Sequence, residues 1–168
     1  WESKLEPVYP YRKAGPAVEK INGSLTAPAA PKIGVAKPKV IIPVFPGTNC
    51  EYDTAKAFAR AGADPEILVI RNLTPADVTA SCEALVKAIG KSQIVMLPGG
   101  FSGGDEPDGS AKFIASFFRN PAVTEAVRRL LQQRDGLMLG ICNGFQALIK
   151  LGLVPYGDIR PITACDPT

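Results

Sequence analysis

The sequence predicts an α/β domain in which crossover helices cover a parallel sheet. From residue 39 onward, short apolar runs alternate with longer helical stretches, the pattern that such sheets produce. The 168 residues, 46% of them hydrophobic, are enough for one domain with a substantial core. Residues 1–38 hold six prolines and little periodicity, so we interpret them as a leader or linker, with the domain proper at residues 39–168.

Three strands and two helices are expected in the first half of this domain. Buried strands are predicted at residues 40–45, 67–70 and 94–97, because each is a short apolar run. Alanine and phenylalanine recur on one side of residues 53–61, which predicts a helix that the next glycine ends. A second helix should run from Thr74 to Ile89, since threonine is a good N-cap and a proline follows at the first helical position.

The second half continues the alternation after a glycine-rich loop. This loop, residues 98–105, directly follows the third strand. Helical segments are expected at residues 111–118 and 122–132, and a fourth buried strand at residues 137–141. That strand runs straight into Cys142, after which apolar residues at helical spacing predict an amphipathic helix.

Cys142 is the candidate nucleophile. Gly140-Ile141-Cys142-Asn143-Gly144 has the form G-x-C-x-G between a strand and a helix, the cysteine version of the nucleophile elbow. Such a turn strains the backbone of the nucleophile and needs small neighbours, while the helix N-terminus that follows favours a thiolate. The alternative, of equal weight on this pentapeptide alone, is that Cys142 is an ordinary buried thiol at a strand end.

The glycine-rich loop adds to the case for a site. Ligands of open parallel sheets gather outside the carboxyl ends of the strands, where both Gly99-Gly100 and Cys142 are expected. The backbone amides of Gly100 and Asn143 could stabilise the oxyanion that forms when Cys142 attacks a carboxamide. Taken singly, the loop is equally typical of an ordinary connection, and residues 46–50 form a turn first and a possible site wall second.

Charge and composition exclude several classes of function. The formal charge is +3 without a basic run, which predicts no nucleic-acid or membrane partner, and no apolar stretch approaches the roughly 20 residues of a membrane span. We expect a cytoplasmic protein. The four cysteines lie far apart and are expected as free thiols, and the acids at 105, 106 and 108 are interpreted as solvated loop residues rather than metal ligands. The chain has no histidine, so it cannot form a Cys-His dyad by itself.

Three motifs together resemble a known family. Residues 45–51 (FPGTNCE), 98–102 (PGGFS) and 140–146 (GICNGFQ) are similar to the glutaminase domains of the phosphoribosylformylglycinamidine synthases, which are class I glutamine amidotransferases. Residues 103–110 resemble the form in which this domain is fused to the C-terminus of a large synthetase chain. The resemblance covers roughly residues 39–160.

The resemblance implies a flavodoxin-like doubly wound parallel sheet and a role for each matching residue. Cys142 corresponds to the nucleophile that forms a glutamyl thioester, and Gly100 and Asn143 to the oxyanion-hole positions. Phe101 and Gln146 correspond to the lining of the glutamine pocket. Three further positions are implied in substrate binding: Gly99, Ser102 and Gly144.

The resemblance also implies partners. The glutaminase would pass ammonia to a synthetase domain of the same enzyme, where ATP and Mg²⁺ activate formylglycinamide ribonucleotide for conversion to the amidine, a step of purine biosynthesis. No cofactor is expected in the glutaminase domain itself, and residues 1–38 would link it to the synthetase.

One departure from the family pattern is decisive. Class I amidotransferases complete their triad with a His-x-Glu pair C-terminal to the cysteine, and this chain contains no histidine. We therefore expect a C-terminally truncated fragment that hydrolyses glutamine poorly on its own. Two alternatives remain open: a cysteine-elbow hydrolase or glyoxalase-type enzyme built on the same sheet, and a non-catalytic docking module.

Overall fold

A computed structural model describes residues 4, 6–8, 20, 22–23, 34–103, 110–161 and 163 of the chain. The chain divides into two compact units, residues 1–31 and residues 32–168. Most of the predicted leader lies outside the described residues, as do the acids at 105, 106 and 108, and Cys165.

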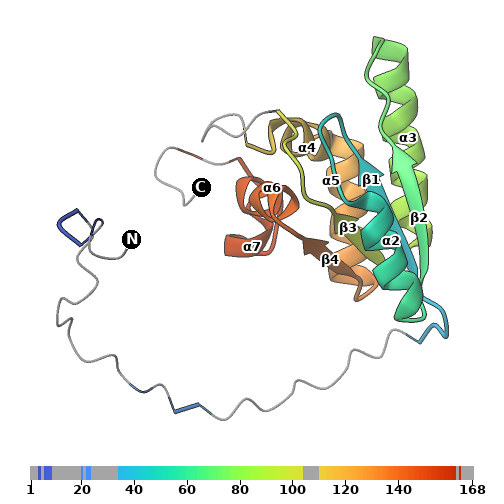
Figure 1. Ribbon diagram of the computed structural model, residues 1–168. Helices are drawn as coiled ribbons and strands as arrows, with labels where there is room; N and C mark the ends of the chain where they lie inside the picture. The colour runs from blue at the N-terminus through green and yellow to red at the C-terminus, as the bar shows by residue number, and fades with distance from the viewer. Residues whose placement is uncertain are drawn as a thin grey trace. The chain divides into compact units, whose positions relative to one another are not determined.

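The second unit is built on a four-stranded parallel sheet, which confirms the predicted fold class. The strands follow the order β2-β1-β3-β4, and every neighbouring pair is parallel (Figure 1). In this order β2 is added on one side of β1, whereas β3 and β4 are added on the other side, as in flavodoxin-like doubly wound sheets. The bounds of the strands are β1 (Lys39–Val44), β2 (Asp64–Val69), β3 (Ile94–Leu97) and β4 (Leu137–Gly140).

Helices connect the strands as predicted. One crossover, between β3 and β4, carries two α-helices and a π-helical turn where the sequence predicted two plain helical segments. The helices are α2 (Glu51–Arg60), α3 (Pro75–Lys91), α4 (Lys112–Phe118), α5 (Pro121–Arg128), η1 (Arg129–Gln133), α6 (Asn143–Leu151) and α7 (Leu153–Tyr156). None of these helices, nor any other in the described part of the chain, is long and apolar enough to cross a membrane.

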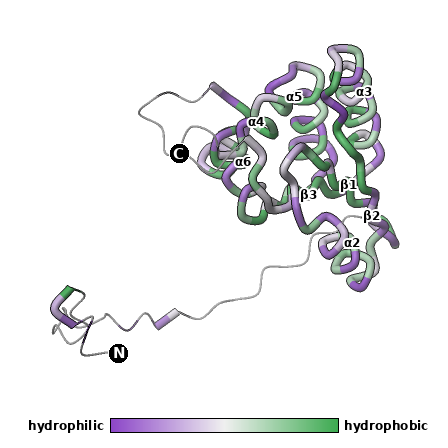
Figure 2. The backbone as a smooth tube through the Cα atoms, turned by 45° about the horizontal axis from the view of Figure 1, so that its top comes forward, coloured by the Kyte–Doolittle hydropathy of each residue, from purple (hydrophilic) through white to green (hydrophobic). Residues whose placement is uncertain are grey.

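Side chains of the central strands alternate between two hydrophobic clusters. Ile41 and Val95 point into the larger cluster, which α3, α4, α5 and α6 complete, while Val40 and Met96 point into a smaller one beneath α2. Figure 1 shows α2 on one face of the sheet and α3 and α5 on the other, and in Figure 2 the central strands are mostly hydrophobic. Both faces of the inner strands are therefore buried, as expected of a doubly wound sheet.

Strand β2 begins at Asp64, three residues before its predicted start at residue 67. The prediction missed Asp64-Pro65-Glu66 because these residues are polar or lack an N–H. β2 is an edge strand in the described sheet, with β1 as its partner, so one side of its backbone needs no ladder partner and a proline is tolerated.

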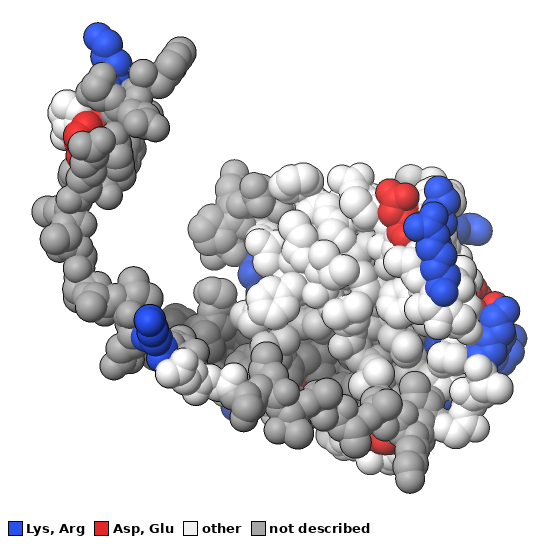
Figure 3. Space-filling model, turned by 60° about the horizontal axis from the view of Figure 1, so that its bottom comes forward, with Lys and Arg blue, Asp and Glu red and all other residues white. Residues whose placement is uncertain are grey.

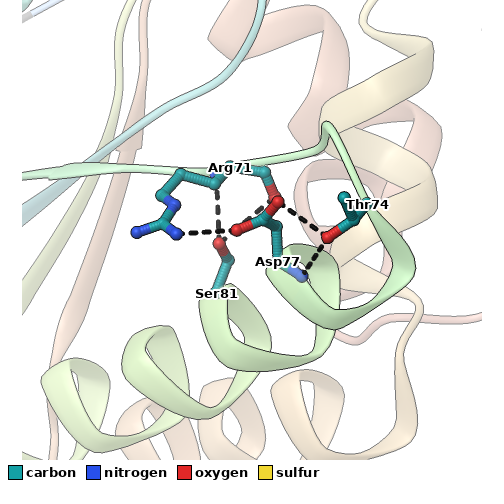
Figure 4. A network of polar contacts seen from close by, with 4 residues as sticks. All are labelled: Arg71, Thr74, Asp77 and Ser81. Carbon is teal, nitrogen blue, oxygen red and sulfur yellow. Dashed lines mark hydrogen bonds and ion pairs between the residues drawn. The ribbon is translucent and has the colours of Figure 1, made fainter.

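The predicted cap of α3 is present and forms part of a polar network after β2 (Figure 4). The Asp77 N–H donates to Thr74 Oγ1 (3.1 Å), and the Thr74 hydroxyl donates to Asp77 Oδ2 (2.8 Å). Arg71 Nη2 reaches Asp77 Oδ1 at 2.7 Å, and the Arg71 N–H donates to Ser81 Oγ at 2.9 Å. These contacts fix the turn between β2 and α3 at the carboxyl edge of the sheet.

Candidate functional site

Loops from three neighbouring strands meet at the carboxyl edge of the sheet. The loop after β1 pairs with the loop after β3 through an antiparallel bridge between Thr48 and Gly100. On either side of the bridge, the Asn49 N–H donates to the Gly99 carbonyl and the Phe101 N–H donates to the Gly47 carbonyl, both at 2.8 Å. The glycine-rich loop is thus held by the first loop, and the possible role of residues 46–50 as a site wall stays a prediction.

Cys142 occupies the third loop, between β4 and α6, in a rare backbone conformation. Its φ of 53° and ψ of −112° lie outside the regions that residues with a Cβ prefer, and its side chain is exposed. It is the N-cap residue of α6, so the amide groups of the first helical turn surround it. The structure therefore presents this thiol as the G-x-C-x-G pattern predicted.

Both glycines of the elbow are required by close backbone packing. A Cβ on Gly140 would lie 2.5 Å from the Gly144 carbonyl oxygen, and a Cβ on Gly144 would overlap the Leu97 carbonyl of β3. Real Cβ atoms do not approach backbone so closely. The spacing of the two glycines therefore lets α6 start directly against the ends of β3 and β4.

The glycine-rich loop lies directly beside the nucleophile. A Cβ on Gly99 would be 3.4 Å from the Cβ of Cys142, and Gly100 has a φ of 135° that favours glycine. Neither the Gly100 N–H nor the Asn143 N–H donates to an acceptor in the described part of the chain, whereas the neighbouring Phe101 and Gly144 amides are both used. Two backbone donors are thus available beside Cys142, one on the glycine-rich loop and one on the residue that follows Cys142.

The side chain of Asn143 joins these two loops, which the sequence did not predict. It is only 3% exposed. Its Oδ1 accepts the Ser102 N–H at 3.1 Å, and its Nδ2 donates to Gln146 Oε1 at 3.0 Å. The first bond spans 41 residues of sequence, so no local pattern could have revealed it.

Of the other predicted site residues, two are exposed to solvent and two are buried. Phe101 is 58% exposed and Gln146 is also exposed, so both side chains are accessible at this edge. Ser102 is fully buried, and Gly144 is buried against β3. The roles in substrate binding that the resemblance implied for these residues stay predictions.

The remaining described cysteines differ from Cys142. Cys50 is exposed at the start of α2, and Cys82 belongs to α3, where its side chain is buried in the core. Burial, and to a smaller extent the charge of Glu83, raises the pKa of the Cys82 thiol, which makes it a poor nucleophile. Among the described residues, no group of three or more histidine, cysteine or acidic side chains could hold a metal ion.

Comparison with known proteins gives consistent matches. Residues 37–168 match the family described as the CobB/CobQ-like glutamine amidotransferase domain. Phosphoribosylformylglycinamidine synthase subunit PurQ of Dehalococcoides mccartyi is 36% identical over 121 residues, covering 72% of this chain and 43% of that protein. The PurQ subunit of Methanococcus maripaludis is 38% identical over 116 residues, covering 69% and 38%.

A solved structure titled PurLQS from Thermotoga maritima is 27% identical to the chain, with a TM-score of 0.48, over 70% of this chain and 45% of that one. The chain thus spans less than half the length of the curated relatives described above.

Proposed function

Because the chain belongs to the CobB/CobQ-like glutamine amidotransferase family, we propose that its α/β domain is a glutaminase that releases ammonia from glutamine, with Cys142 as the nucleophile. Family membership confirms the resemblance found in the sequence. The observation that carries the proposal is the position of Cys142, exposed at a strained elbow beside the Gly100 and Asn143 N–H groups, neither of which has an acceptor among the described residues.

These groups supply the main steps of amide cleavage. The Cys142 thiolate attacks the side-chain carboxamide carbon of glutamine, and the carbonyl oxygen becomes an oxyanion that the Gly100 and Asn143 amides stabilise. When the carbonyl re-forms, the C–N bond breaks and the nitrogen leaves as ammonia after taking a proton. Water then adds to the γ-glutamyl thioester, the C–S bond breaks, and glutamate and the thiol are released.

The 168 residues contain no histidine that could move these protons. A histidine base for Cys142, which the family pattern supplies as a His-x-Glu pair, would have to come from outside them. We therefore expect the chain alone to turn glutamine over slowly while its Cys142 still reacts with electrophiles. The second candidate is a non-catalytic docking module, for which Cys142 would show no selectivity for glutamine-like reagents.

The names of the relatives supply the wider reaction. We propose that the ammonia serves a phosphoribosylformylglycinamidine synthase, in which a synthetase portion binds ATP and Mg²⁺ and converts formylglycinamide ribonucleotide to the amidine in the cytoplasm. The described residues offer no metal-binding cluster, and the glycine-rich loop lacks the Lys-Ser or Lys-Thr of a nucleotide P-loop. In this proposal, ATP and Mg²⁺ bind to the synthetase partner.

The test is covalent labelling of the 168-residue chain with a chloroketone analogue of glutamine, mapped by mass spectrometry. We expect selective modification of Cys142 that glutamine blocks, with Cys50, Cys82 and Cys165 as internal controls and Cys142→Ser as the matched variant. Labelling of Cys142 no faster than of Cys50, which is also exposed, would refute the proposal and favour the docking module. Labelling that glutamine does not slow would favour the hydrolase of the same fold.

A further inference from the structure

The two proposed oxyanion donors belong to different parts of the chain. Gly100 lies on the loop after β3, and Asn143 is the first residue of α6 after β4. An oxyanion hole functions only if its donors hold a fixed separation before the reaction begins. Hydrogen bonds within either loop cannot set that separation. The pairing of β3 with β4 fixes where the two loops leave the sheet, and a contact between the loops is needed to fix their positions beyond it.

Among the described residues, one side-chain hydrogen bond joins the glycine-rich loop to α6, the helix that follows Cys142. The Ser102 N–H, two residues beyond Gly100, donates to Asn143 Oδ1 at 3.1 Å in a buried position. On its other side the same loop is bonded to residues 47–49, which follow β1. Asn143 therefore offers its backbone N–H to the oxyanion and uses its side chain to hold the loop that carries the other donor.

The orientation of the Asn143 amide is set by its neighbours. The Ser102 N–H can only donate, so the amide atom that faces it has to be the oxygen. The Nδ2 group then points to Gln146, one helical turn away in α6, and donates to its Oε1 at 3.0 Å. An exposed glutamine thus holds a buried asparagine in the one orientation that bonds the loop.

We propose that the Asn143 side chain is a positioning residue that sets the spacing of the oxyanion donors, and that Gln146 orients it. This inference rests on the proposed function. It assigns to Gln146 a task besides lining the glutamine pocket, since its Oε1 is already bonded to Asn143. A group that positions donors should affect the maximal rate of attack by Cys142 more than the binding of the glutamine analogue.

The test compares two reagents on the 168-residue chain. Attack on the chloroketone analogue of glutamine creates an oxyanion, whereas reaction with a small methanethiosulfonate involves no carbonyl and depends on thiol access and thiolate content. We expect Asn143→Ala to lower the maximal chloroketone rate about 10- to 100-fold and the methanethiosulfonate rate less than about threefold. Gln132→Ala, which removes an exposed amide from η1, is the matched control and should change neither rate.

Gln146 variants keep the test valid if Asn143→Ala does not fold. Gln146→Ala removes the orienting acceptor at an exposed site and should lower the maximal rate about 3- to 10-fold, whereas Gln146→Glu keeps an acceptor and should restore it. In the Asn143→Ala background, Gln146→Ala should slow the maximal rate no further. A wild-type chain whose Cys142 is not labelled would refute the glutaminase, whereas normal labelling with equal maximal rates for wild type, Asn143→Ala and Gln146→Ala would overturn only this inference.

Discussion

Arg128 and Asp158 form a two-point ion pair that holds the segment after α7 against α5. Arg128 Nε lies 2.7 Å from Asp158 Oδ1, and Nη2 lies 2.9 Å from Oδ2. Nη2 also donates to the Ile159 carbonyl at 3.0 Å, and the Ile159 side chain is buried in the larger core cluster. A planar guanidinium matches both carboxylate oxygens at once, which a lysine could not do.

This pair predicts a dependence of stability on pH. The hydrogen bonds from Arg128 hold the pKa of Asp158 below its usual value, so the stabilising effect is complete above the unfolded pKa of about 4 and is lost as the pH falls through the lower folded pKa. Urea unfolding of the wild type should therefore lose more stability between pH 5 and pH 3 than that of Asp158→Asn. Equal losses for the two proteins would contradict the assignment.

The contact between Gly144 and β3 predicts a strong effect of one methyl group. Gly144→Ala should lower the free energy of unfolding by about 1–3 kcal/mol, because the added Cβ overlaps the Leu97 carbonyl and backbone has to move. Gly90→Ala is the matched control. A Cβ at Gly90 meets nothing within 4 Å in helix α3, so that variant should be neutral or more stable by up to about 1 kcal/mol. Similar urea midpoints for the two variants would refute the packing argument.

Replacing Gly100 by alanine should reduce the reactivity of Cys142 more than it reduces the stability of the fold. In Gly100→Ala the new Cβ would overlap the Gly47 carbonyl, so the loop has to shift and its N–H loses its present position relative to Cys142. Labelling of Cys142 by the chloroketone should fall about 100-fold.

Gly62→Ala separates backbone strain from loop displacement. Gly62 also has a positive φ, of 90°, but a Cβ there meets nothing within 4 Å, and it follows α2 at the opposite end of the strands. We expect this variant to be destabilised by about 1 kcal/mol while labelling stays at the wild-type rate. A parallel loss of labelling in both variants would show that the effect is general.

The cap of α3 predicts a modest change in stability. Thr74→Ala removes the acceptor of the Asp77 N–H and should cost about 1 kcal/mol in the free energy of unfolding, measured with urea. Thr79→Ala lies in the same helix, where its exposed hydroxyl only bonds the Pro75 carbonyl, and it should be neutral or slightly stabilising. The assignment of Thr74 as the cap would fail if Thr79→Ala proved the more harmful change.

The sequence predicted those features that depend on local patterns. Alternating apolar runs located the four described strands, and the G-x-C-x-G spacing identified the strained conformation of Cys142. The prediction that the fourth strand is buried was wrong, because Leu137 and Leu139 of β4 are exposed. The positions of the strands and of the elbow could be predicted because short apolar runs and tight turns place their requirements on adjacent residues. The early start of β2 at Asp64 was missed because an edge strand tolerates polar residues.

Contacts between distant residues were beyond sequence reasoning. The Asn143 amide meets a backbone N–H 41 residues away, and Arg128 meets Asp158 across 30 residues. Asparagine and arginine occur at many surface positions, so neither residue type signals such a bond. The same limit applies to the buried position of Ser102, which only the packing of the loop against α6 determines.

Part of the surface of the second unit carries few charged side chains. In Figure 3 most of the charged side chains visible on this unit lie toward the right of the view, beside a broad area without charge. Leu137 and Leu139 of β4, and Ile141 directly after the strand, are 41%, 45% and 52% exposed. Leu139 and Ile141 also line an open cavity of about 420 Å³ between α2 and the sheet. Apolar area of this kind predisposes the isolated chain to self-association at high concentration.

Because Leu97 pairs with Gly140, the relative positions of Gly100 and Cys142 depend on the number of residues between each of them and this pair. Gly100 comes three residues after Leu97 and Cys142 two residues after Gly140, so the two loops leave the sheet at the same level. One residue inserted before Cys142 would shift the thiol by about 3.3 Å and reverse its direction. A residue added to the crossover in α4 or α5 alters neither count. Length variation during evolution, or a domain inserted by design, should therefore be accepted in that crossover and rejected at the ends of β3 and β4.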